Sequence, residues 1–242
     1  MISSERVGLY SSVTLVLLTI ITLGFALTAV PISGAFCSAD CVEYPYLDTL
    51  EQFPGDFIWM YFAMFMLIAY MVFMVSLHDY ATTKKKIFGK ISLCFTVLSV
   101  GILLLAYFIQ SSVIPASLMN GEQAGIPLII QYNPHGIFIA LEELGHIMMS
   151  FSFLFIAFIF KADTGIQKYI KWIFIIAFIL VVLSFVIVSI NHGIVRKDRF
   201  EVYIISIDWL VLIINGILMS IVYKKLLNND RDTVARTSGS VK

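Results

Sequence analysis

Two glutamates and a histidine stand inside an apolar run that is long enough to cross a membrane. Residues 131–160 are mostly aliphatic and aromatic, yet they include Glu142, Glu143 and His146. Charged groups at membrane depth are costly, and by default they mark a functional site. Glu142 and Glu143 precede His146 by four and three residues, so in a helix either carboxylate can meet the imidazole. The run therefore predicts a helix with a functional site inside the membrane.

The start of this helix is predicted from its capping residues. Asn133 is a favourable N-cap, and Pro134 suits the first helical position because the N–H that proline lacks has no partner there. A helix over 134–160 has about 27 residues and a length of about 40 Å, enough to cross a bilayer. Its polar residues share one stripe: His135, Glu142 and His146, with Glu143 and Ser150 beside them.

The composition of the chain indicates a membrane protein with several spans. Hydrophobic residues make up 60% of the 242 residues, charged residues make up 13%, and the mean hydropathy is +0.93. Soluble domains are about one quarter charged, so the soluble class is excluded and the lipid bilayer is the expected surrounding. The formal net charge of zero leaves no basic excess, so nucleic acid is not an expected partner.

Six apolar runs predict an all-α, polytopic membrane protein with both termini in the cytoplasm. We expect one transmembrane domain over 1–227, followed by a polar, disordered cytoplasmic tail over 228–242. The spans are predicted at about 9–33, 57–77, 91–114, 134–160, 172–190 and 203–223. The sequence contains no convincing internal repeat and no nucleotide-binding, zinc-protease or nucleophile-elbow motif.

The charges of the loops predict the orientation of the chain. The most basic short loop holds the run Lys84, Lys85 and Lys86, so it is expected in the cytoplasm and can bind anionic lipid headgroups. Residues 37–56 contain five acids and no Lys or Arg, so this loop is expected outside. The loop over 195–201 opposes the rule, although its two acids offset its three basic residues.

Two of the three cysteines lie in the acidic loop. Cys37 and Cys41 are four residues apart, and a local disulfide is favoured if the loop faces an oxidising space. Two free thiols are the alternative. A metal pair is less favoured, because the loop contains no histidine and no second pair of cysteines.

Further polar residues fall at depths similar to those of Glu142 and His146. At about 1.5 Å per residue, Glu142 lies about 12 Å below the outer end of its helix and Asp208 about 8 Å below the end of the sixth span. We therefore expect a pocket that opens outward between the third, fourth and sixth spans. Its candidate binding residues are Glu142, Glu143, His146, Asp208, Asn215, Tyr107, Gln110 and His135, with Asp56 and His192 near its mouth. The alternative is that these side chains only hold the helices together.

A metal site is a second interpretation of the same residues. The E-x-x-H spacing of Glu143 and His146 is half of a di-iron carboxylate site, but a second E-x-x-H is missing. A single Zn²⁺ held by Glu142 or Glu143, together with His146 and Asp208, stays open. No cofactor is predicted.

Two segments carry a resemblance to other chains. Residues 132–155 (YNPHGIFIALEELGHIMMSFSFLF) and 207–225 (IDWLVLIINGILMSIVYKK) resemble a loosely defined set of uncharacterised six-span prokaryotic membrane proteins. The resemblance implies the fold and a prokaryotic source, and it implies no activity.

These features favour a multi-pass protein of the cell inner (plasma) membrane that binds or transports a small solute or ion. The carboxyl groups of Glu142, Glu143 and Asp208 would link such binding to protons. A noncatalytic sensor or accessory subunit is the first alternative, and an intramembrane enzyme acting on a lipid-like substrate is the second. We lean against an enzyme, and a homodimer stays open.

Overall fold

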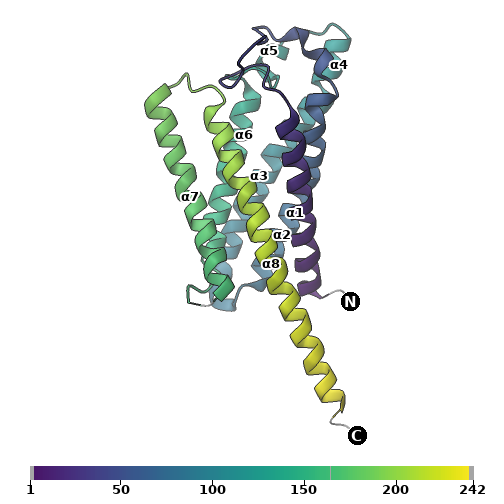
Figure 1. Cartoon of the computed structure of the whole chain (residues 1–242), viewed down its shortest axis with the longest axis vertical. Coiled ribbons are helices and arrows are strands. Elements are labelled where there is room, and N and C mark those ends of the chain that lie inside the picture. The colour runs from purple at the N-terminus through teal and green to yellow at the C-terminus, as the bar shows by residue number, and fades with distance from the viewer. Residues whose placement is uncertain (1–2, 164, 240–242) are drawn as a thin grey trace.

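Six long helices form a bundle in the computed structural model, which describes residues 3–163 and 165–239, with side chains described as far as Asn229. The long helices are α1 (Ser4–Thr28), α2 (Ile58–Tyr80), α3 (Lys86–Ser112), α6 (Ile137–Ala157), α7 (Gly165–His192) and α8 (Arg199–Gly239) (Figure 1). Each contains a window apolar and long enough to cross a membrane. The chain is therefore an all-helical, multi-pass membrane protein, as predicted, and its described residues contain no strand.

The helices pack in a ring with one helix outside it. α1 lies between α2 and α8, α3 lies between α2 and α6, and α6 closes the ring against α8. α7 packs on the outer side of α6 and α8, and most of its apolar side chains stay exposed. This exposure fits contact with lipid. α1 begins and α8 ends at the same end of the bundle (Figure 1).

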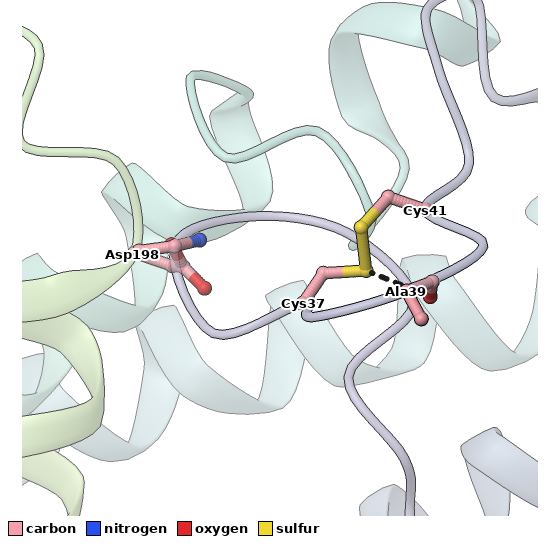
Figure 2. The surroundings of a disulfide bond; sticks show 5 residues. Cys37, Ala39, Cys41 and Asp198 are labelled. Carbon is pink, nitrogen blue, oxygen red and sulfur yellow. Dashed lines mark hydrogen bonds between the residues drawn. A yellow bond between two sulfur atoms is a disulfide. The ribbon is translucent and has the colours of Figure 1, made fainter.

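The two ends of the bundle differ in their connections. One end, here called the disulfide end, carries the short helices η1 (Leu47–Gln52), η2 (Gly55–Phe57), α4 (Ile114–Met119) and α5 (Ile126–Ile129), and a disulfide joins Cys37 to Cys41 (Figure 2). The other end, here called the N-terminal end, has η3 (Thr83–Lys85). There the Lys85 ammonium donates hydrogen bonds to the carbonyl oxygens of Ile159 and Phe160, which lie just beyond the end of α6.

Several helix boundaries differ from those predicted, and two of them bear on the segments around the pocket. α1 ends at Thr28 rather than near 33, because Pro31 cannot continue a helix and restricts the residue before it. α6 begins at Ile137, three residues after the predicted start. The predicted N-cap, Asn133, is wrong, because the N-cap is Gly136; the Asn133 side chain instead closes a turn before the helix, where its Oδ1 accepts from the His135 N–H at 2.9 Å. His135 therefore precedes the helix and does not share its polar stripe.

The predicted disordered tail does not begin at residue 228. α8 continues through Gly239, because a helix that is already formed extends at the cost of ordering only one residue at a time. Residues 240–242 of the predicted tail, together with residues 1, 2 and 164 of the predicted domain, lie outside the described residues.

Candidate functional site

A pocket of about 200 Å³ opens at the disulfide end of the bundle. It is bounded by α6, by the start of α8, by the loop after α1 and by the segments that precede α2 and α6. At about 30 Å³ per water molecule, the pocket has room for a small hydrated ion or a small organic solute. Its lining residues are Ala29, Val30, Pro31, Ile32, Ser33, Asp56, Trp59, Gln131, Tyr132, Pro134, Phe138, Ile139, Glu142, Asp198 and Glu201.

The pocket is acidic. Four of its lining residues carry carboxyl groups, and no Lys, Arg or His is among the described residues that line it. Three aromatic residues, Trp59, Tyr132 and Phe138, also line the wall. A carboxylate-rich pocket with aromatic walls attracts cations, both by charge and through the faces of the rings.

Two of the four carboxylates are held by neutral donors at the rim. The Tyr132 hydroxyl donates to Oδ2 of Asp56 at 3.1 Å, and the Ala35 N–H donates to Oδ1 of Asp198 at 2.7 Å. Figure 2 shows Asp198 beside the disulfide-bonded loop. Burial, followed by the nearby Asp56 charge, raises the pKa of Tyr132, so this hydroxyl keeps its proton and remains a donor at neutral pH. Each rim acid thus has one neutral hydrogen-bond donor and no cationic partner among the described residues.

The loop approaches Asp198 closely because of a glycine. Gly34 has a φ of +81°, and a Cβ there would lie 2.4 Å from Oδ2 of Asp198. Only glycine adopts this left-handed backbone without strain and leaves room for the carboxylate. The residue at position 34 thus fixes the loop after α1 onto the start of α8, and this contact forms part of the pocket rim.

Glu142 lies at the inner wall of the pocket without a hydrogen-bond partner. Its side chain is fully buried, and neither carboxyl oxygen has a partner among the described residues. The Tyr107 hydroxyl of α3 and the Glu201 carboxyl of α8 lie close beside it, near hydrogen-bonding range, but neither forms a hydrogen bond with it. Two carboxyl groups side by side cannot both stay charged without help, so the pair holds either a proton or a cation.

Glu143 faces the other way, toward α7. Arg196 donates to both of its carboxyl oxygens, and the guanidinium carbon lies 5.3 Å and 5.8 Å from the ring centres of Phe185 and Phe200. The carboxylate is thus paired, and its partner is held in place by two cation–π contacts. Glu143 lines a separate pocket with His135, Arg196 and Lys197, so it does not share the acidic pocket.

His146 pairs with Asp208 instead of with either glutamate. Nδ1 of His146 lies 3.0 Å from Oδ2 of Asp208, and the Ser150 hydroxyl donates to Oδ1 of Asp208 at 3.0 Å. All three side chains are buried between α6 and α8. Gly145 positions this face, because a Cβ there would lie 2.5 Å from the Leu103 side chain of α3. α6 and α3 therefore pack closely on one side, and His146 faces α8.

The order of these contacts is not that of a serine hydrolase. In a catalytic triad the serine donates to the histidine, which in turn donates to the acid. Here Ser150 and His146 both contact Asp208, and Nε2 of His146 has no partner among the described residues. Ser150 therefore lacks the base that would activate it.

The remaining predicted residues are spread over different surroundings. Gln110 clamps the segment before α6: its amide donates to the Ile129 carbonyl and accepts from the Gln131 N–H. Asn215 is buried on α8, and neither end of its amide has a partner in the described part of the chain. His135 is exposed in the separate pocket, and His192 is exposed near the end of α7.

The structure changes the predicted composition of the pocket wall. The third span was expected to line the pocket, but α3 contributes no residue to the described lining. Its Tyr107 neighbours Glu142 without lining the pocket itself. The loop after α1, Asp198 and Glu201 take its place. Glu201 precedes Asp208 by seven residues on α8, so helical spacing could have placed it on the same face. The Arg196 partner of Glu143 has no comparable sequence signal, because it comes from a loop.

The zinc alternative finds no support in this arrangement. Within residues 3–163 and 165–239, no group of three His, Cys, Asp or Glu side chains is placed to hold a metal ion. Anionic lipid at Lys84–Lys86 and a homodimer stay predictions, although the Lys85 ammonium already binds two carbonyl oxygens.

Comparison with known proteins gives no relative: no family model, no curated protein and no solved structure matches the chain. The resemblance to six-span prokaryotic proteins stays a prediction. Function is therefore inferred from the pocket and the side chains around it.

Proposed function

We propose that this membrane protein binds a small cation in the acidic pocket at the disulfide end. The observation that carries the proposal is Glu142, whose carboxyl oxygens are buried and have no hydrogen-bond partner among the described residues, beside a second carboxyl, Glu201. A buried polar group normally has a hydrogen-bond partner, and two adjacent carboxyl groups are stabilised by the positive charge of a proton or a cation between them. A cation in the pocket supplies that charge.

The same observation weighs against the other functions considered. In an accessory protein, every polar side chain of the buried cluster should have a hydrogen-bond partner within the protein, whereas Glu142 has none among the described residues. A hydrolase should present an activated nucleophile, whereas Ser150 contacts only the acid. Transport of the bound cation needs a second access route or broken helices, and α6 and α8 run unbroken beside the pocket. Binding is therefore the part of the predicted function with direct support.

The orientation of the pocket is part of this proposal. A disulfide forms and persists in an oxidising space, and Cys37–Cys41 lies at the end where the pocket opens. The lysines of residues 84–86 lie at the opposite end, as the rule of positive cytoplasmic loops requires. The pocket would therefore open to the outside of the cell.

Thermal unfolding with two probe cations tests the binding. Methylammonium or sodium would replace N-methylglucamine at constant ionic strength. A cation that binds the folded state at 100 times its Kd adds about 2.7 kcal/mol to the free energy of unfolding. We expect the wild-type melting temperature to rise with at least one probe, and the rise to be lost in Glu142→Gln.

Glu51→Gln is the matched control, because Glu51 is an exposed acid at the same end that does not line the pocket. It should keep the full response. A wild-type protein whose melting temperature ignores both cations, or a Glu142→Gln variant that responds as the wild type does, would overturn the proposal.

Labelling of an engineered cysteine tests the orientation. Lys84 is exposed, so Lys84→Cys in a Cys94→Ser background should react with a membrane-impermeant maleimide only after the cells are opened. Reaction in intact cells would place the pocket on the cytoplasmic side.

A further inference from the structure

A series of buried polar groups continues from the pocket into the bundle. Glu142 and His146 are one helical turn apart on α6, so they share a face. His146 contacts Asp208 on α8. The acidic pocket therefore does not end at Glu142, and the next group along the bundle is a second titratable pair.

The series goes on through a cluster of four hydroxyls, here called the hydroxyl cluster: Tyr70, Ser92, Thr96 and Ser152. Asp208 lies within electrostatic range of the Tyr70 hydroxyl, and that hydroxyl donates to Ser152 at 3.1 Å. The Ser152 hydroxyl lies 2.7 Å from that of Thr96 and 3.0 Å from that of Ser92. All four side chains are fully buried. The cluster thus joins α2, α3 and α6 by short contacts.

The last group of the series is a histidine near the N-terminal end. Gly89 is one turn from Ser92 on α3, and a Cβ at Gly89 would lie 2.5 Å from Nδ1 of His78. The missing side chain lets the His78 ring approach α3. Nδ1 of His78 is buried and has no partner among the described residues. A titratable ring thus stands at one end of the series and a carboxyl pair at the other.

We propose that this series of groups conducts protons between the acidic pocket and the N-terminal end of the bundle. The inference rests on the proposed function in one respect: the Glu142–Glu201 pair is taken to hold either the bound cation or a proton. Each hydroxyl or imidazole on the path accepts one proton and releases one. A proton that enters at the pocket thus leaves at His78, and no bond other than O–H and N–H changes.

Unpartnered atoms along the path support conduction over a purely structural role. Nε2 of His146 and the Ser99 hydroxyl, one helical turn from Thr96, are both buried without a partner in the described part of the chain. Such atoms in a membrane bundle normally contact buried water. Hydroxyl groups joined by water molecules form a hydrogen-bonded chain that carries protons, whereas apolar side chains packed between them would interrupt that chain.

The charged and titratable groups around the path are few. Glu142 faces Tyr107 and Glu201, Glu201 also faces Asp198 and Glu143, and Asp208 faces His146 and Tyr70. Arg196 forms an ion pair with Glu143, so Glu143 is not counted among the groups that exchange protons along the path. Protonation of the Glu142–Glu201 pair and binding of a cation there should therefore compete directly.

Proton flux into liposomes containing the purified protein tests the inference. A pH-sensitive dye inside the vesicles would report flux driven by a potassium–valinomycin potential. We expect wild-type flux well above that of empty liposomes. Thr96→Val keeps the shape of the side chain but removes the hydroxyl that Ser152 contacts, so flux should fall by about tenfold or more, the scale of losing a positioned proton carrier.

Thr19→Val is the matched control. Thr19 is also fully buried and also donates to the carbonyl four residues before it, as Thr96 does, but it lies on α1, which contributes no group to the path. It should keep wild-type flux. Ser152→Ala provides a second interruption if Thr96→Val unfolds, and melting temperatures would establish which variants are folded.

The outcomes separate the two proposals. Wild-type liposomes that conduct no better than empty ones, or a folded Thr96→Val variant with wild-type flux, overturn proton conduction. If methylammonium or sodium still raises the melting temperature in that case, cation binding stands alone. If proton flux depends on Thr96 but neither cation raises the melting temperature, proton conduction stands and the cation-binding proposal is overturned.

Discussion

Glu142 and Glu143 are neighbours in the chain, but they lie in opposite electrostatic surroundings. Glu143 points toward α7, where Arg196 pairs with it between two phenylalanine rings. Glu142 points into the acidic pocket, where the Glu201 carboxyl and the Tyr107 hydroxyl are its titratable neighbours and no cation pairs with it among the described residues. A turn of about 100° around one helix thus separates a stabilising ion pair from a candidate binding site. The partner, and not the depth or the residue type, decides which role a buried acid takes.

The largest expected effect is the loss of the Arg196 partner. Arg196→Gln leaves the Glu143 carboxylate without a cation, and we expect the free energy of unfolding to fall by about 3 kcal/mol, since breaking a largely buried pair strands the other charge. Thermal or chemical unfolding in detergent measures this. Adding Glu143→Gln to the same variant should recover much of the loss. An Arg196→Gln protein as stable as the wild type would remove the contrast between the two glutamates.

The next effect concerns two α8 residues that share a face. Asp208 is hydrogen-bonded to His146 and Ser150, whereas the Asn215 amide has no partner among the described residues. Asp208→Asn should lower the free energy of unfolding by about 2 kcal/mol, the value of hydrogen bonds to a charged group. Asn215→Leu should cost less than about 0.5 kcal/mol, because the amide gives up no contact. A larger loss for Asn215→Leu would show that its amide is bound by water.

A smaller effect is expected at the rim of the pocket. Tyr132→Phe removes the hydrogen bond to Asp56 and should cost about 1 kcal/mol near neutral pH. Burial, then the Asp56 charge, raises the pKa of Tyr132 in the folded state. The stability that this tyrosine contributes is therefore fully present below its unfolded pKa of about 10 and is lost as the pH rises above it. Unfolding curves of the two proteins should converge at alkaline pH, and parallel curves would count against the contact.

The smallest change in stability is expected at Glu142 itself. Glu142→Gln neutralises a buried carboxyl that has no partner, so the free energy of unfolding should hold or rise by up to about 1 kcal/mol. Glu143→Gln, by contrast, should lower it, because it strands Arg196. Unfolding of the two variants side by side measures the difference. A marked destabilisation by Glu142→Gln alone would assign Glu142 a structural role and end the pocket hypothesis.

The sequence alone determined the class of the protein. Long apolar runs with few charges leave only a membrane-spanning helical bundle, and the exposed α7 helix shows how directly hydropathy predicts it. The sequence also pointed to α6, because charged groups inside such a run are rare for energetic reasons. It placed Glu142, His146 and Asp208 near one another by helical spacing and depth alone.

Tertiary structure decided which of these groups are partners. Helical spacing allowed His146 to contact either glutamate, but α6 packs against α8 so that His146 contacts Asp208 instead. Arg196 and Asp198 belong to the loop before α8, and no local rule predicts where a loop side chain ends. Hydropathy and helical period are properties of one segment, whereas pairing depends on how two segments meet. The pocket exists only because four separate segments meet around Glu142.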